Sequence, residues 1–192
     1  MEKTAKVIRY ITVAPVLAGI TLILLYFFRT DIFESTAALL ISLFFLTILP
    51  LLAYPLQRFI PPYKDRGRDG QRSLAMLFAV GGYILGSVYC LIARTGIGLW
   101  IIYLEYLLSG AVILILNKAF HLKASGHACG SAGPVALLVY FGIPALLPGL
   151  LILALTFWAS LITKRHTSWQ FLGGAVVAVA VLLLLRVIFG IA

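Results

Sequence analysis

Long apolar runs follow one another through almost the whole chain, and they limit its fold more than any other feature. Hydrophobic residues make up 62% of the 192 residues and charged residues only 11%, and the mean hydropathy is +1.10. A soluble domain cannot bury that much apolar surface, so the sequence predicts a polytopic integral membrane protein. The runs are also too long for the strands of a membrane barrel, which alternate over about ten residues. We therefore expect an all-α helical bundle.

A transmembrane helix needs about 20 mostly apolar residues, and on this measure the chain has six to seven spans. The candidates cover residues 9–28, 35–57, 73–93, 98–116, 128–146, 150–162 and 169–189. The sixth candidate is short, which is why the count is six to seven. We expect one domain overall, in which residues 1–60 form an N-terminal transmembrane hairpin and residues 61–192 form the core.

Proline and glycine predict where these helices end or bend. Pro50 is expected to kink or end the second span, because a proline inside a helix removes a hydrogen bond and clashes with the preceding turn. Gly67 and Gly70 are expected to keep residues 58–72 as the longest polar loop. The pair Pro148-Gly149 is expected to form a tight turn before the sixth span.

Basic residues gather on one side of the predicted membrane. If seven spans alternate, the N-terminus, the loops 58–72 and 118–127 and the turn 164–168 face the same side. They carry twelve of the fifteen lysines and arginines, which predicts that this side is cytoplasmic. Eight of these twelve residues lie in segments that could bind an anion. If they are left out, this side keeps four basic residues and the other side has three. We expect a plasma-membrane protein whose partners are lipids and not nucleic acid.

Three polar segments on this side offer the groups that phosphoryl transfer needs. They are residues 64–72, rich in lysine and arginine, 123–127, Lys-Ala-Ser-Gly-His, and 165–170, Arg-His-Thr-Ser-Trp-Gln. Cationic side chains, and backbone N–H groups where a helix starts, stabilise phosphate oxygens. One imidazole can attack phosphorus while another protonates the leaving oxygen. No metal or other cofactor is expected, because the cationic side chains take its part.

These segments resemble the signature of the type 2 phosphatidic acid phosphatase superfamily, which includes membrane lipid phosphatases and vanadium haloperoxidases. Its motif Pro-Ser-Gly-His is similar to residues 124–127, with alanine for proline. Its motif Ser-Arg-x5-His-x3-Asp keeps the spacing from His166 to Gln170, with glutamine for aspartate and Ser160 for arginine. Its motif Lys-x6-Arg-Pro is matched loosely by residues 64–72, with one residue more between lysine and arginine and serine for proline. The resemblance covers roughly residues 64–185.

The resemblance implies a divergent, metal-independent lipid phosphatase with a helical core of this family's kind. His166 would be the nucleophile that forms a phosphohistidine, His127 the general acid, and Gln170 would orient His166 through its amide oxygen. The residues that would hold phosphate are Lys64, Arg72, Lys123, Ser125, Gly126 and Arg165. The expected reaction is hydrolysis of phosphatidate, phosphatidylglycerophosphate, or an isoprenyl phosphate or diphosphate, with release of inorganic phosphate.

Two other functions stay open at this point. A catalytically impaired relative would bind or transport anionic phospholipid or isoprenyl phosphate, and Gln170 and Ser160 favour it because neither supplies the charge of the motif residue. A small transporter would be centred on Glu105, an ionisable residue in the middle of a span. His121 is expected to cap a helix or reach the membrane interface, and Gly173-Gly174 predicts close helix packing.

Overall fold

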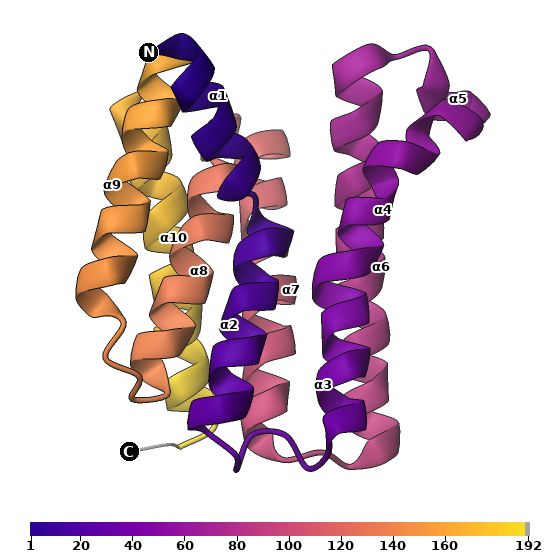
Figure 1. Ribbon diagram of the computed structural model, residues 1–192, viewed down its shortest axis with the longest axis vertical. Coiled ribbons are helices and arrows are strands. Elements are labelled where there is room, and N and C mark those ends of the chain that lie inside the picture. Colours follow the sequence, from indigo (N-terminus) through magenta and orange to yellow (C-terminus); the bar gives the residue numbers. More distant parts are fainter. Residues whose placement is uncertain (191–192) are drawn as a thin grey trace.

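The computed structural model describes residues 1–190, and every regular element in them is helical (Figure 1). The elements are α1 (Glu2–Ile11), α2 (Ala14–Phe28), α3 (Thr36–Leu43), the π-helical turn η1 (Phe44–Ile48), α4 (Leu49–Leu56), the 3-10 turn η2 (Gln57–Phe59), α5 (Pro61–Lys64), α6 (Gly67–Ala93), α7 (Ile97–Lys118), α8 (Gly126–Tyr140), α9 (Leu146–Ile162) and α10 (Ser168–Ile188). The expected all-α fold is confirmed for this part of the chain.

Four helical stretches are long and apolar enough to cross a membrane. They are Thr36–Phe59, Gly67–Ala93, Ile97–Lys118 and Ser168–Ile188. The bent pair α1 and α2 gives a fifth if it is counted as one broken span. Helix α9 is apolar but has 17 residues, and α8 has 15. Residues 1–190 therefore contain four to five candidate spans by length, and a count of six to seven would need α8 and α9 to cross as short helices.

The first apolar run, expected as one helix over residues 9–28, is broken at Thr12. Helix α1 ends at Ile11, α2 begins at Ala14, and the two are bent by 49°. Pro15 explains the break, because in a continuous helix its ring would clash with the carbonyl of Ile11. The prediction of a single helix is wrong, and the break lets α1 pack on α9 while α2 packs on α8 (Figure 1).

Three predicted breakers have other roles. Pro50 does not end its span, because the π-helical turn η1 directly before it makes room for the ring and the helix continues. Gly70 lies inside α6, where a Cβ would overlap the carbonyl oxygen of Tyr63, so it allows α5 to pack on α6. Pro148 lies in the first turn of α9, where a missing N–H is tolerated, so no turn separates it from the helix.

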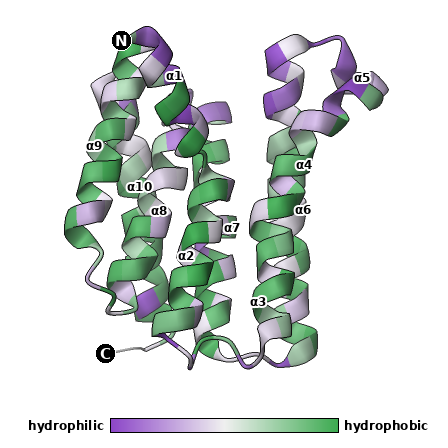
Figure 2. Cartoon of the chain, viewed as in Figure 1, coloured by the Kyte–Doolittle hydropathy of each residue, from purple (hydrophilic) through white to green (hydrophobic). Residues whose placement is uncertain are grey.

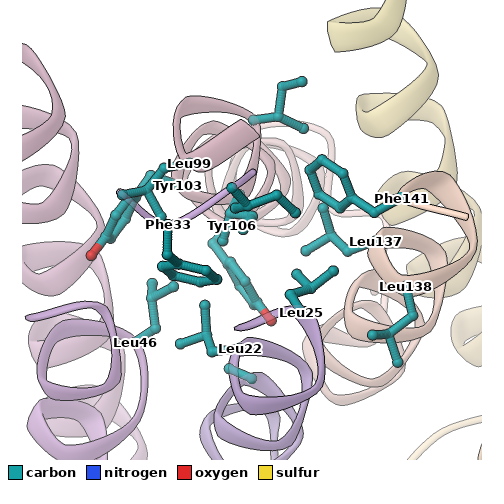
Figure 3. Close-up of a cluster of buried hydrophobic side chains, with 14 of the residues drawn as sticks. Leu22, Leu25, Phe33, Leu46, Leu99, Tyr103, Tyr106, Leu137, Leu138 and Phe141 are labelled. Atoms are coloured by element: carbon teal, nitrogen blue, oxygen red, sulfur yellow. The ribbon is translucent and has the colours of Figure 1, made fainter. Parts of the chain in front are cut away.

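Helix α7 joins two groups of helices. On one side α4 packs along α6, and α6 packs on α7. On the other side α8 packs against α2, α9 and α10, and α10 returns to α7. Figure 3 shows the buried side chains at this junction, among them Leu22, Leu25, Leu99, Tyr103 and Leu137. The helices of residues 1–60 thus contact the C-terminal helices directly.

Candidate functional site

A cavity of about 1160 Å³ lies between α1, the start of α2, α4, α6, α7, α8 and the loop that joins α9 to α10. Part of its wall is basic and consists of Lys6, Arg9, Arg68, Arg72, Lys164 and Arg165. Another part is apolar and includes Met76, Ala79, Val80, Leu107 and Leu114. Figure 2 shows that hydrophilic residues gather in α1 and α5, whereas α2 and α4 are mostly hydrophobic. A ligand with an anionic head and an apolar tail matches both walls.

The start of α8 fixes the position of His127. The hydroxyl of Ser125 caps this helix by accepting a hydrogen bond from the Ala128 N–H at 3.2 Å, and Ser125 is fully buried. Its own N–H donates to the carbonyl of Gln170 at 2.9 Å, which ties α8 to the first turn of α10. A Cβ on Gly174 would overlap the Ser125 carbonyl oxygen, so glycine permits this close approach. Ser125 therefore builds the site through its cap and its backbone.

The ring of His127 contacts the break between α1 and α2. Its Nε2 lies 3.4 Å from the hydroxyl oxygen of Thr12. That hydroxyl already donates to the carbonyl of Ile8 at 2.8 Å. We therefore assign the Nε2–H of His127 as the donor to Thr12, which leaves Nδ1 as the nitrogen available for proton transfer. Nothing in the local sequence around Thr12 predicted this contact, because it joins residues 115 positions apart.

The start of α10 orients His166. Its Nδ1 lies 3.3 Å from the side-chain oxygen of Gln170, and the same oxygen accepts the backbone N–H of Thr167 at 3.2 Å. The Thr167 hydroxyl in turn accepts the Gln170 N–H, which completes a capping box. Because the backbone donor requires an oxygen at this position, Nδ1–H of His166 is the donor and Nε2 keeps the lone pair. Gln170 thus contacts His166 as expected from the sequence.

Both imidazoles lie outside the candidate spans, and both are held neutral. Burial lowers the pKa of His127 to about 4, and electrostatic interactions with Arg9 and His166 add to the shift. Burial also lowers the pKa of His166. The hydrogen bond to Gln170 opposes this shift, and the charges of Arg9 and Arg72 add to it. At neutral pH the site therefore presents two uncharged rings among several cations.

Arg9 is a site residue that sequence reasoning missed. Its guanidinium Nη1 donates to the hydroxyls of Ser160, at 3.2 Å, and Thr163, at 3.5 Å. The hydrogen bonds place a cation of α1 directly beside Ser160 of α9. In the sequence Arg9 belongs to a basic flank typical of any first span, and only the break after α1 brings it to the cavity.

The remaining predicted residues divide into two sets. Gly126, Arg72 and Arg165 line the cavity with the two histidines. Lys64 and Lys123 have exposed side chains and are not among the described residues that line it. Lys64 is the last residue of α5 and lies 4.0 Å from Asp65, and Lys123 belongs to the exposed segment before α8.

Glu105 lines the same cavity from α7. It is 1% exposed, accepts a hydrogen bond from Ser109 at 3.1 Å and lies against Gly133 of α8. His121 is exposed and is not among the described residues of the cavity wall.

Comparison of the chain with protein families, with curated proteins and with solved structures finds no match.

Proposed function

We propose that this chain is a membrane lipid phosphatase that hydrolyses a lipid phosphomonoester or an isoprenyl pyrophosphate through a phosphohistidine. The observation that carries the proposal is that His127 and His166 line one cavity together with six basic side chains. The apolar wall supports a lipid substrate, because the tail can stay against it while phosphate meets the cations. The likeness of residues 124–127 and 166–170 to the type 2 phosphatidic acid phosphatase motifs supports the same function. We propose further that the basic end faces the cytoplasm at the plasma membrane.

The reaction proceeds in two steps. In the first, the Nε2 lone pair of His166 attacks phosphorus, the bond from phosphorus to the lipid oxygen breaks, and His127 gives a proton to that oxygen. Gln170 holds the other ring nitrogen, so the attacking one stays aimed at the cavity. In the second step water attacks phosphorus and His127 takes its proton. The phosphorus–nitrogen bond then breaks, which releases inorganic phosphate and restores His166.

The proton on His127 must arrive with the substrate, because the free ring is neutral. A phosphate anion beside the imidazole favours its charged form and raises its pKa from about 4. Binding therefore charges the acid in the state in which it is needed. The neutral form of His166 is already the nucleophilic one.

The test is phosphate release by the purified protein in lipid nanodiscs. The substrates are phosphatidate, phosphatidylglycerophosphate, isoprenyl phosphate and isoprenyl diphosphate. His127→Ala and His166→Ala should each abolish release, and His121→Ala is the matched control because that ring is exposed and lies outside the cavity wall. Turnover at the wild-type rate in both His127→Ala and His166→Ala would refute the mechanism.

A second candidate is a protein that binds or moves anionic lipid without hydrolysing it. The observation that favours it is the neutral amide of Gln170 on His166, where a carboxylate would stabilise the imidazolium. Replacing a charge-assisted hydrogen bond by a neutral one costs about 1 kcal/mol or more, which is about tenfold in rate. Rapid mixing with phosphorus-labelled lipid separates the two: an acid-labile phosphoenzyme, absent in His166→Ala, identifies the enzyme. Lipid binding without it identifies the binder.

A further inference from the structure

Arg9 is a half-buried cation that has no carboxylate partner among residues 1–190. Its two hydrogen bonds go to the neutral hydroxyls of Ser160 and Thr163, and both use Nη1. Within residues 1–190 the ion pairs are Lys6–Glu2, Arg29–Asp31 and Lys64–Asp65. A guanidinium that is partly removed from water without a counter-charge is unfavourable. Its position therefore points to an anion that the protein itself does not supply.

Arg9 lines the cavity and has N–H donors for which residues 1–190 supply no acceptor. A guanidinium has five N–H donors in a planar fork, and in the described part of the chain Nε and Nη2 have no protein acceptor. Arg9 lines the cavity beside His127 and His166, and its charge contributes to the lowered pKa of both rings. The guanidinium and both imidazoles thus line one cavity.

The contacts of α1 hold Arg9 in this position. Helix α1 packs on α9, and the hydroxyls of Ser160 and Thr163 fix one nitrogen of the fork. Three residues further on, Thr12 contacts the His127 ring. The acidic residue on α1 that also lines the cavity, Glu2, is paired with Lys6 at 2.8 Å and is exposed. Helix α1 therefore contributes Arg9 to the site, and Thr12 at its C-terminal end contributes the ring contact.

We propose that Arg9 binds the phosphate group of the lipid, with Nε and Nη2 donating to two phosphate oxygens, and that α1 is a structural part of the site. Arginine suits this role because its fork matches two oxygens of one phosphate, whereas lysine offers a point charge. The inference rests on the proposed function only in that the anion is a lipid phosphate. Binding itself requires no hydrolysis.

The test is calorimetric titration of the protein in detergent with inorganic phosphate and with dioctanoyl phosphatidate. Arg9→Gln should weaken the binding of both ligands by at least about tenfold, because a hydrogen-bonded charge is lost. Arg9→Lys should bind with intermediate affinity. Lys3→Gln is the matched control, since it removes one positive charge from an exposed position of the same helix outside the cavity wall. It should stay within about twofold of wild type.

If Arg9 only held α1 against α9 and did not bind the anion, the expected results would differ. If Arg9 binds the anion, guanidinium ion added to Arg9→Ala should restore phosphate binding, because it supplies the missing fork. Wild-type affinity in Arg9→Gln, or a loss in Arg9→Ala that guanidinium does not restore, overturns the proposal. If the wild-type protein releases no phosphate from any of the four lipids while Arg9→Gln loses phosphate binding, the phosphatase fails and the anion site stands.

Discussion

Two neighbouring glycines in α10 give a controlled test of how the site is assembled. At Gly174 a Cβ would overlap the Ser125 carbonyl oxygen and come within 3.0 Å of its carbon and 3.2 Å of the Ala128 Cβ. At Gly173 a Cβ would meet nothing within 4 Å. Gly174→Ala must therefore push α10 away from the start of α8, and Gly173→Ala is the matched control in the same helical turn.

The difference between the two variants can be estimated from the contacts. Overpacking costs about 1–3 kcal/mol, and the hydrogen bond from the Ser125 N–H to the Gln170 carbonyl, at 2.9 Å, contributes about 1 kcal/mol more. Both variants gain roughly the same helix propensity from alanine. That gain cancels, so Gly174→Ala should be about 2–4 kcal/mol less stable than Gly173→Ala.

Thermal unfolding in detergent measures this difference. For a chain of this length, 1 kcal/mol corresponds to about 2–4 °C, so the two melting temperatures should differ by about 4–16 °C. Gly174→Ala should also weaken the binding of inorganic phosphate, because His127 and the Gln170 backbone move apart. Equal melting temperatures and equal phosphate affinities would refute the close contact between α8 and α10.

Two further predictions concern the histidines. Gln170→Glu keeps the capping box and places a negative carboxylate beside His166. Initial rates of phosphate release should therefore rise about tenfold. Gln170→Ala should lower both the rate and the melting temperature. A rate in Gln170→Glu at or below wild type would argue against His166 as nucleophile. Sulfate binding should strengthen as the pH falls toward 4 and level off below it, because an anion favours the imidazolium of His127, whose pKa in the free site is about 4. Titrations across this range should show the trend in wild type and lose most of it in His127→Ala.

The sequence alone predicted the all-α fold class, and it predicted that the polar segments lie close together. Apolar runs of this length leave helices as the only membrane-spanning elements that satisfy their own backbone groups without closing a barrel. Because most basic residues were expected on one side, they were also expected to be neighbours. The cavity confirms this, since Arg9, Arg72, His127 and Arg165 come from the four predicted basic segments.

The features that were not predicted from the sequence depend on contacts between distant residues or on residues with competing local roles. The bond between Arg9 and Ser160 joins two helices whose relative position no local pattern encodes. Pro15 did carry a signal, because a proline four residues after Ile11 disfavours a continuous helix. Ser125 also carried one: serine directly before a helix is a preferred N-cap. Its hydroxyl, expected on phosphate, accepts the Ala128 N–H as the helix cap and is fully buried.

The packing of α1 on α9 sets the order in which the protein becomes functional during synthesis. Arg9 and Ser160 are 151 residues apart. At a synthesis rate of about 5–20 residues per second, Arg9 is therefore made roughly 8–30 s before Ser160. Until then α1 has no α9 to lie on, and its guanidinium stays in water or among head groups. A nascent chain that stops before α9 can insert most of its apolar helices and still lack Thr163, His166 and the cap of α10. The proposed phosphate site is thus complete only when almost the whole chain has been made.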